Sequence, residues 1–514
     1  MPTYLSPGVY VEEVESGSRP IEGVGTATAA FVGFAADGPF DEPTLVTNWG
    51  QYTQIFGGFA EDCYLPQSVF GYFLNGGTTC YVVRIGRGNG NGNGSAAAGR
   101  VALPQAQLGG YRLTAKALPD GKTADLAVEV ADPQDENAGD DRFTLLVKQD
   151  GKVVETHNVT TKRGKENLVT VVREKSNLIT IEEVTGGMVA KPAKGTVALR
   201  EAPPEPAAPP EPVNPEVFVG DVNDRTGFGG LEVIDDVTMI AVPDLVGLYE
   251  RELIDLEGLK AVQLGMIAHA ELMGDRMAIL DPPPGLSPQQ VKEWRSEVAG
   301  YDSKYATLYY PWIKIFDPTS GTNTFVPPSG HMAGVWARTD GTRGVHKAPA
   351  NEVVRGAVAL QTQLTQAEQS VLNPLGVNCI RSFPNRGIRV WGGRTLSSDP
   401  AWRYLNVRRL FNYLEESILN GTQWVVFEPN DDALWARIRR TISAFLVMEW
   451  RKGALFGLTP DEAFYVKCDR ETNPAESIDL GQVICEVGIA PVKPAEFVIF
   501  RLAQLSGGTS LVNE

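Results

Sequence analysis

The chain has 514 residues, more than a single hydrophobic core usually supports, so two to four domains are expected. Its hydrophobic content of 43% and charged content of 21% are typical of a globular protein, and no apolar run approaches the roughly 18 residues that a membrane-spanning helix needs. The formal net charge of −17 argues against general nucleic-acid binding, which requires a basic surface to displace counterions from phosphates.

The first predicted element is a strand in YLSPGVYVEEVESG, residues 4–17. Val9, Val11 and Val14 favour extended structure, a Pro-Gly pair precedes them and an acidic stretch follows. A strand at the end of a chain needs a pairing partner, either in the same chain or in another copy of it. The opening residues MPTYLSP have neither the basic nor the apolar region of a signal peptide, and none is expected.

Two breaks in composition enclose a separate segment. The first is GRGNGNGNGSAAAG, residues 86–99, and the second is EAPPEPAAPPEPVNP, residues 201–215, whose prolines favour an extended spacer. Between them DLAVEVADP, RFTLLVKQDGKVVETHNV, NLVTVV and LITIEEV have the composition of short strands separated by turns. The sequence therefore predicts a small all-β module on two flexible stems.

Strands and helices alternate from about residue 216 to 346, up to a turn-rich segment KAPAN at 347–351. VTMIAVPDL, RMAILDPPPG and YATLYYPWIKIFDP are predicted strands, and LEGLKAVQLGMIAHAEL has helical spacing. This alternation predicts an α/β unit with partly parallel strands. Asp244 and Asp281 follow two of the strands, where an enzyme of this class would place a site.

The last third of the chain is helical and then returns to strand. AWRYLNVRRLFNYLEESILNGTQW and EPNDDALWARIRRTISAFLVMEWRKG both repeat apolar residues on one helical face, the second with Asn430 or Asp431 as its cap and Lys452-Gly453 as its end. PAEFVIFRLAQLSGG, residues 494–508, is apolar on both faces, so it predicts a strand buried centrally in a sheet.

The familiar catalytic and phosphate-binding patterns fail in detail. The glycine-rich segment after Ile85 does not fit G-x-G-x-x-G. LPDGKT, residues 118–123, ends like a phosphate loop, but Lys116 stands upstream where the first glycine of such a loop would be. The four histidines are scattered, and no G-x-S-x-G is present. The odd number of five cysteines without C-x-x-C spacing favours reduced thiols, with an interchain disulfide or a metal site as alternatives. No catalytic residue, cofactor or metal is therefore predicted.

Two groups of residues allow a functional and a structural interpretation. Asp281 in AILDPPPG could serve as a catalytic carboxylate, but the three prolines favour a turn that it caps. Arginines interleaved with Trp391 in GIRVWGGRTLS, followed by Arg408 and Arg409, could stack bases or clamp phosphate. The acidic composition favours ion pairs within or between subunits for these arginines.

Several longer segments, in this order and spacing, resemble one known family. They are YLSPGVYVEEV, FVGFAADGPFDEPTLVTNWGQYTQIFGGF, FLNGGTTCYVVRI, YYPWIKIFDP, VPPSGHMAGVWARTD, RGVHKAPAN, LNPLGVNCIRSFPNRGIRVWGGRTLSSDPAWRYLNVRRL, GTQWVVFEPND and DLGQVICEVGIAPVKPAEFVIFRL. Together they resemble the sheath proteins of contractile injection machines, which occur in contractile-tailed phages, R-type tailocins and extracellular phage-tail-like particles. The resemblance covers most of the chain outside residues 97–215.

The resemblance implies a multidomain α/β (α+β) fold. A core domain would combine residues 1–90 and 346–514, an α/β domain of residues 216–345 would be inserted in it, and the variable module of residues 97–215 would decorate the outside. The chain would be a structural subunit and not an enzyme.

The resemblance also implies strand exchange between subunits, which answers the question of the terminal strand's partner. Residues 8–14 and 496–503 are similar to segments that sheath subunits donate to their neighbours. The side chains concerned are Val9, Tyr10, Val11, Val14, Phe497, Val498, Ile499, Phe500 and Leu502.

The implied partners are many copies of the same chain in a helical sheath, an inner tube protein, and baseplate and cap or terminator proteins, with no nucleic acid and no direct membrane insertion. The sheath would contract from a metastable extended state to drive the tube into a target. Synthesis and assembly in the bacterial cytoplasm are expected, as part of a phage tail or of a tail-like particle. Asp461 and Glu462 in LTPDEAF are expected to face the tube, although an exposed capped helix explains them equally well.

Two other functions remain open at this stage. One is a static coat or surface-layer subunit, which would exchange strands without contracting. The other is an α/β enzyme with a carboxylate site at Asp244 or Asp281.

Overall fold

The computed structural model describes residues 20–60, 63–86, 212–318 and 321–501, and within 105–199 mainly the strands and one helix. Residues 87–99 of the Gly-rich stem, residues 201–211 of the Pro-rich stem and the predicted N-terminal strand lie outside these residues. The chain divides into two compact units, one of residues 1–95 and 212–514 and one of residues 96–211. We call them the main unit and the second unit.

An eight-stranded sheet forms the centre of the main unit, in the order β18-β17-β13-β12-β11-β1-β3-β2. The six inner strands run parallel, and the two edge strands pair antiparallel with their neighbours. Most inner strands are apolar and buried on both faces, as a parallel sheet between helices requires. The strands are β1 (Ala29–Gly33), β2 (Thr44–Val46), β3 (Cys80–Arg84), β11 (Met239–Ala241), β12 (Met277–Leu280), β13 (Ala306–Tyr310), β17 (Val377–Phe383) and β18 (Gly387–Val390).

Helices cover both faces of this sheet, each with its own hydrophobic cluster. One face carries α5 (Asp244–Glu250), α6 (Leu256–Met273), α7 (Pro288–Glu293) with the π-helical turn η2 (Trp294–Ala299), and α9 (Gln366–Leu372). The other face carries α1 (Trp49–Phe56), α2 (Leu65–Asn75) and α8 (Ser329–Arg343). The short elements are α4 (Glu216–Val219), η1 (Gly229–Val233) and η3 (Asn373–Leu375), and β14 (Ile313–Asp317), β15 (Thr322–Val326) and β16 (Ala357–Leu360) form a three-stranded sheet.

The central sheet differs from the predicted division of the main unit into a core and an inserted domain. Strands β11 to β13, from the predicted inserted domain 216–345, lie between β1 of the N-terminal part and β17 of the C-terminal part. Residues of all three segments share the same hydrophobic clusters. A parallel sheet joins strands that are distant in sequence, so composition breaks along the chain do not mark its limits.

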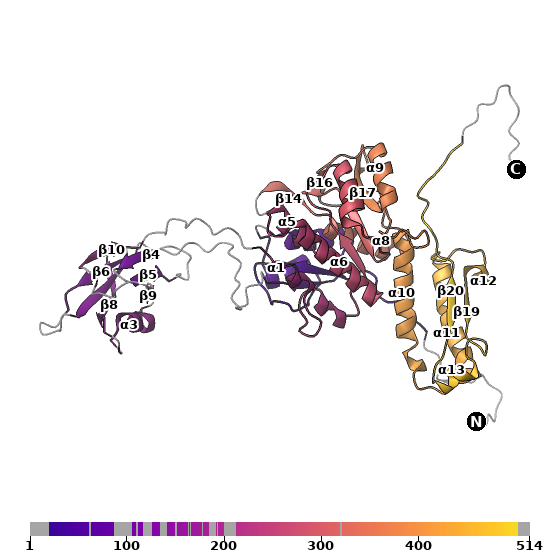
Figure 1. Cartoon of the computed structure of the whole chain (residues 1–514), viewed down its shortest axis with the longest axis horizontal. Coiled ribbons are helices and arrows are strands. Elements are labelled where there is room, and N and C mark those ends of the chain that lie inside the picture. Colours follow the sequence, from indigo (N-terminus) through magenta and orange to yellow (C-terminus); the bar gives the residue numbers. More distant parts are fainter. Residues whose placement is uncertain are drawn as a thin grey trace, which may run out of the picture. The chain divides into compact units, whose positions relative to one another are not determined.

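A helical layer follows the sheet in the chain and has its own core. It contains α10 (Leu405–Gly421), η4 (Gln423–Val425), α11 (Asp432–Arg451), α12 (Pro460–Ala463), α13 (Ala475–Asp479) and the hairpin of β19 (Phe464–Lys467) and β20 (Glu486–Ile489). Figure 1 shows α10, α11 and this hairpin side by side. Asp431 caps α11 by accepting a hydrogen bond from the Leu434 N–H at 2.8 Å, and Gly453 follows the helix with φ of 83°, in agreement with the predicted cap and end.

The second unit contains two antiparallel sheets around a separate core. One comprises β4 (Gln105–Leu108), β5 (Tyr111–Ala115) and β9 (Ile179–Glu183); the other comprises β10 (Gly195–Ala198), β6 (Leu126–Ala131), β7 (Arg142–Gln149) and β8 (Lys152–Thr160). The prediction of an all-β module is wrong in one element, because NLVTVV begins the helix α3 (Leu168–Lys175). Asn167 caps this helix, and Leu168, Val171 and Val172 are buried on one helical face. This burial outweighs the strand preference of the β-branched residues.

The prediction of a central strand at residues 494–508 is also wrong for the single chain. Residues 492–501 have no strand assignment, and residues 502–508 lie outside the described part. Among the described residues no helix is both long and apolar enough to cross a membrane.

Candidate assembly interface

Helix α10 holds the segment through which the N-terminal end of the described chain enters the main unit. Ile21 is buried in the core of the helical layer, beside Gly421 at the end of α10. The Val24 N–H donates to Ser417 Oγ at 3.1 Å, and Arg409 Nη2 donates to the Thr26 carbonyl at 3.0 Å. Residues 21–26 therefore follow α10 before the chain enters β1.

A buried ion pair connects α10 to α8, the helix that packs on the central sheet. Arg409 on α10 donates two hydrogen bonds to Asp340 on α8, at 2.9 and 2.5 Å, and both side chains are 3% exposed. The Thr26 hydroxyl donates to the same carboxylate at 2.7 Å. Removing one member would leave a buried charge without its partner, which costs far more than a surface ion pair.

The C-terminal segment is anchored near the opposite end of α10. Arg394 donates to both oxygens of Glu496, at 2.8 and 2.6 Å, and Asn373 Nδ2 donates to one of them at 2.8 Å. Burial alone would raise the pKa of Glu496, but the hydrogen bonds from Arg394 and Asn373 outweigh it and hold this pKa below its ordinary value. Asn406 on α10 also donates to the Val492 carbonyl at 3.1 Å. We call Glu496 and its partners the C-terminal anchor.

Four large apolar side chains follow the anchor and are exposed. Phe497, Val498, Ile499 and Phe500 have exposed fractions between 69% and 85%. Four consecutive exposed side chains of this size make this run a candidate interaction segment, because large apolar patches are uncommon on protein surfaces. They are the described members of the predicted exchanged strands. The other members, Val9, Tyr10, Val11, Val14 and Leu502, lie outside the described residues.

The hairpin β19–β20 is a two-stranded sheet within the described chain. Phe464, Val466 and Ile489 pack on the core of the helical layer, so one face of the hairpin is covered. The Tyr465 side chain is 60% exposed and lies against Gly488, where a Cβ atom would come within 2.1 Å of the ring. A pair of strands is too small to be stable alone, and its outer edges offer unpaired backbone groups to further strands. Sequence reasoning did not predict this hairpin.

The predicted tube-facing pair lies on the short helix α12. Asp461 and Glu462 are both exposed, and Glu462 Oε2 accepts a hydrogen bond from the Leu458 N–H at 2.8 Å. Glu462 therefore has a local structural role in addition to any contact outside the chain. Phe456 and Leu458, which are 72% and 89% exposed, lie in the preceding loop, and their exposure gave no signal in the sequence.

Asp244 and Asp281, the two carboxylates considered as an enzyme site, are buried and connect elements of the fold. Asp244 accepts hydrogen bonds from the backbone N–H groups of Phe34, Tyr64 and Leu65, which join the end of β1 and the start of α2 to α5. Asp281 accepts from the Ser329 N–H at the start of α8, at 2.9 Å. Burial raises the pKa of Asp244 to about 6 and that of Asp281 to about 7. Neither carboxylate faces solvent, so the raised values reflect burial in the core.

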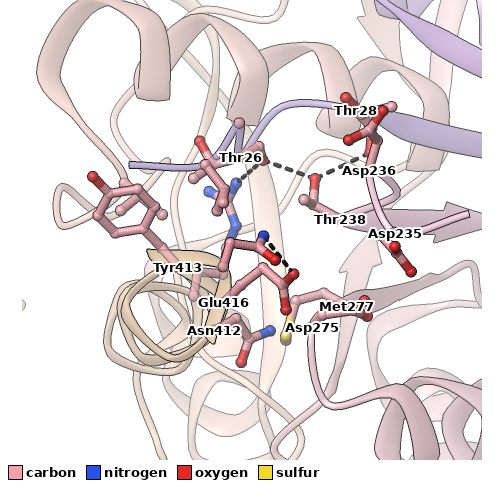
Figure 2. A pocket seen from close by; sticks show the side chains of 15 residues that line it. Thr26, Thr28, Asp235, Asp236, Thr238, Asp275, Met277, Asn412, Tyr413 and Glu416 are labelled. Atoms are coloured by element: carbon pink, nitrogen blue, oxygen red, sulfur yellow. Dashed lines mark hydrogen bonds between the residues drawn. The ribbon is translucent and has the colours of Figure 1, made fainter. Parts of the chain in front are cut away.

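A pocket lies between α10 and the residues that precede β1, β11 and β12 of the central sheet (Figure 2). Thr238 Oγ donates to the Thr26 and Thr28 carbonyls at 2.9 and 3.0 Å, and Asn420 donates to Glu416 at 2.9 Å. Burial raises the pKa of Glu416, and the carboxylates of the pocket add to this effect. Within the described residues, no group of three or more acidic, histidine or cysteine side chains could hold a metal ion. The pocket is therefore a space lined by carboxylates between the helical layer and the central sheet.

The arginine-rich segment forms intrachain contacts. Arg394, Arg408 and Arg409 pair with carboxylates of the same chain. Arg386 lies over the rings of Phe383 and Trp391, at 5.5 Å from each ring centroid. The ion-pair interpretation is thus the one that the contacts of these arginines support.

Family models of the phage tail sheath protein match two adjacent regions of the chain. The model of the central domain covers residues 236–396, and that of the C-terminal domain covers residues 397–504. Together they match more than half of the chain.

Curated relatives carry the same description. The tail sheath protein of Burkholderia phage BcepMu is 24% identical over an alignment of 526 positions, which covers 96% of this chain and 95% of the relative. The tail sheath protein of Vibrio phage KVP40 is 24% identical over 243 residues, 44% of this chain and 35% of that protein. A putative prophage major tail sheath protein of Pseudomonas aeruginosa (strain UCBPP-PA14) is 25% identical over 232 residues, with 44% and 57% covered. The match thus spans from about a third to somewhat over half of the length of the latter two.

Two solved structures share the fold over nearly the whole chain. A sheath chain of an extracellular contractile injection system, the PVC sheath complex in its contracted state, is 25% identical, with a TM-score of 0.58 and coverage of 98% of this chain and 99% of that one. The helical sheath of the anti-feeding prophage in its contracted state is 24% identical, with a TM-score of 0.59 and coverage of 98% and 100%. Family models, relatives and fold agree, and the chain belongs to the phage tail sheath family.

Proposed function

We propose that this chain polymerises into a helical sheath by donating its two terminal segments to the β19–β20 hairpins of neighbouring subunits. The observation that carries this proposal is the C-terminal anchor followed by the exposed run Phe497–Phe500. The anchor holds the base of the segment, while its apolar side chains have no cover in their own chain. Addition of a strand to a sheet edge would pair its backbone groups and bury these side chains.

The path of the segment favours a neighbour over its own hairpin. Between β20 and the anchor, the Ala490 N–H donates to the Ala463 carbonyl and the Val492 N–H donates to the Ala454 carbonyl, at 2.8 and 3.3 Å. Pro491 and Pro494 further restrict the backbone. Hydrogen bonds to the same chain therefore hold residues 490–496 at several points. The Glu496 anchor would have to be released before residues 497–500 could turn back onto β19 or β20.

The geometry of α10 supports a mesh of subunits. The N-terminal segment contacts Ser417 and the C-terminal anchor lies beside Tyr404, which are separated by about 20 Å along a helix with a rise of 1.5 Å per residue. Each subunit would thus donate two segments from separate points, and each hairpin would offer two outer edges to accept them. Such head-to-tail contacts do not close on themselves and generate a helical filament.

The finer functional properties follow from the family and are part of this proposal. The sheath would assemble around an inner tube, between a baseplate and a terminating cap, in the bacterial cytoplasm and as part of a phage tail or a tail-like particle. It would shorten from a metastable extended packing, with the exchanged strands keeping neighbours joined. A similar chain, 24% identical with a TM-score of 0.55, occurs in the baseplate of the anti-feeding prophage.

The test compares the full-length chain with two trimmed chains, one without residues 1–14 and one without residues 497–514. The second keeps Glu496, so the anchor and the fold of the main unit stay intact. We expect tubes or curved polymers from the full chain by electron microscopy and pelleting, and folded soluble subunits from each trimmed chain. A trimmed chain that still polymerised would contradict strand donation by the segment removed.

We also propose that Asp461 and Glu462 contact the inner tube, because they are exposed beside Phe456 and Leu458. The test reverses the charge of Asp461, with Glu476 on α13 as the matched exposed control. Tube-templated assembly should weaken for Asp461→Lys and stay unchanged for Glu476→Lys. Equal assembly of both variants would contradict the tube contact.

A further inference from the structure

Two cysteines occupy opposed positions at the end of the β19–β20 hairpin. The last pair of this antiparallel ladder joins Lys467 with Glu486. Cys468 follows β19 and Cys485 precedes β20, so they are the next pair in the same register. Opposed residues of an antiparallel ladder lie about 4.5–5.5 Å apart between Cα atoms, with side chains on one face. A disulfide needs about 4.4–6.8 Å between Cα atoms, so this register suits one.

The surrounding loop holds the register beyond the last ladder pair. The Asn473 side chain donates to the Ile484 carbonyl at 3.0 Å and accepts from the Ile484 N–H at 2.6 Å. Its Nδ2 also lies 3.8 Å from Cys468 Sγ, and Arg439 of α11 donates to the Cys468 carbonyl. Both cysteines are thus held by the main unit without relying on the ladder alone.

The two thiols are free, touch each other and differ in access. Cys468 is buried and Cys485 is half-buried, and the thiols form a hydrogen bond with each other. Burial raises the pKa of Cys485 to about 12, and the neighbouring Cys468 adds to this. The thiol form therefore dominates at neutral pH, so reaction with an oxidant is slow and accelerates as the pH rises.

We propose that Cys468 and Cys485 form an intrachain disulfide when the protein meets an oxidising medium. The more accessible Cys485, as thiolate, attacks a small-molecule disulfide such as oxidised glutathione and displaces one glutathione thiolate. The Cys468 sulfur, as thiolate, then attacks Cys485 Sγ of the mixed disulfide and releases the second glutathione. The two cysteines lose two protons and two electrons, and one glutathione disulfide is reduced to two thiols.

The bond would connect β19 to β20 and close the loop of residues 469–484, which contains α13. A cross-link of this kind restricts opening of the loop and of the hairpin. In a reducing cytosol the pair would stay as thiols, and oxidation would follow only outside it. If the hairpin accepts strands as proposed above, the bond would hold the acceptor together, but its formation does not depend on that proposal.

The experiment uses the full chain, purified with reductant and then incubated with oxidised glutathione at mildly alkaline pH. Trypsin cuts after Lys467 and Arg470 but not between Lys493 and Pro494, so the disulfide would join peptide 468–470 to peptide 471–501. We expect this linked pair by mass spectrometry without reductant, and its loss with reductant. Cys485→Ser should abolish it. Cys63→Ser, which removes the other half-buried cysteine, should leave it intact.

Two results would overturn the proposal. One is a stable glutathione adduct on Cys485 beside a free Cys468, and the other is linkage of either residue to another chain. Hydrogen exchange then tests the constraint, and backbone amides of residues 464–489 should exchange roughly tenfold more slowly in the oxidised chain. Unchanged exchange would contradict a role in holding the hairpin. Because disulfide formation is read on single subunits, a chain that forms the bond but fails to polymerise contradicts only the strand-exchange proposal.

Discussion

Asp281 illustrates how a buried carboxyl group can resemble a catalytic residue in sequence and yet serve the fold. It follows the central strand β12, where α/β enzymes place functional groups, but its oxygen accepts the Ser329 N–H at the start of α8. Its pKa of about 7 in the folded chain exceeds the ordinary value of 3.8. The folded state therefore binds this proton more tightly, and the resulting stability is lost as the pH rises through about 7.

The first prediction concerns Asp281→Asn, which keeps the acceptor for Ser329 and removes the buried charge. From about pH 5 to about pH 8, the free energy of unfolding of the variant relative to the wild type should rise by roughly 1–3 kcal/mol, since one pKa unit corresponds to about 1.4 kcal/mol. Urea unfolding at the two pH values measures this difference.

Asp281→Leu is the control for this prediction, because it removes the charge and the acceptor together. Relative to Asp281→Asn, which lacks the same charge, it should lower the free energy of unfolding by about 1–3 kcal/mol at both pH values, since the Ser329 N–H is left buried without a partner. A pH dependence of Asp281→Asn equal to that of the wild type would show that the carboxyl group does not titrate in this range.

At the scale of elements, α2 and α8 lie unusually close because glycines line their contact. A Cβ atom on Gly334 would come within 2.4 Å of the Tyr72 carbonyl oxygen, and one on Gly330 within 2.4 Å of Ser68 Cα. Gly341 lies in the same helix, and no atom lies within 4 Å of where its Cβ atom would stand. One helix therefore provides both the test and its control.

The second prediction is that Gly334→Ala and Gly341→Ala change stability in opposite directions. Gly334→Ala should destabilise by about 1–3 kcal/mol, because backbone atoms of α2 would have to shift. Gly341→Ala should stabilise by roughly 0.5–1 kcal/mol, because alanine has the higher helix propensity. Thermal unfolding followed by circular dichroism measures both changes. A loss of stability in Gly341→Ala would contradict the conclusion that space is open beside Gly341.

Elements were predictable where local rules and packing agree. Helix α11 was predicted with Asn430 or Asp431 as its cap and with its end at Lys452-Gly453, because the apolar spacing, the cap and the glycine all favour the same helix; the structure shows Asp431 as the cap. Helix α3 was predicted as a strand, because VTVV has a high strand propensity and its packing partners lie elsewhere in the sequence. The run Phe497–Phe500 was predicted as a buried strand, and in its own chain it is exposed and has no strand structure, so its burial stays a prediction about a neighbouring subunit.

For the whole molecule, the limits of sequence reasoning lie in long-range pairing. The parallel order of β1, β11 and β17 joins three segments of the chain, and no local pattern specifies which strands are neighbours. The candidate interface shows the same limit. The terminal segments were predicted as interface segments from their composition and from the family resemblance. The β19–β20 hairpin, the anchor of Glu496 on Arg394 and the contact of residues 21–26 with α10 depend on the fold.

The second unit is independent of the main unit in its core. Among the described residues, the buried members of its hydrophobic cluster lie between Leu108 and Leu199, and none of them belongs to the three clusters of the main unit. A module with its own core and sequence stems at both ends can be removed without opening the remaining cores.

The third prediction is therefore that deletion of residues 96–211 leaves the main unit folded and able to polymerise. The Gly- and Asn-rich segment 87–95 would then serve as the linker to residue 212. The deleted chain should unfold at the same temperature as the main unit of the full protein, and residues 96–211 alone should give the circular dichroism of a β-rich domain. Electron microscopy should show polymers of unchanged helical spacing, since the proposed strand donors and acceptor are all retained. Soluble, folded but unpolymerised chains would instead place a contact between subunits in the second unit.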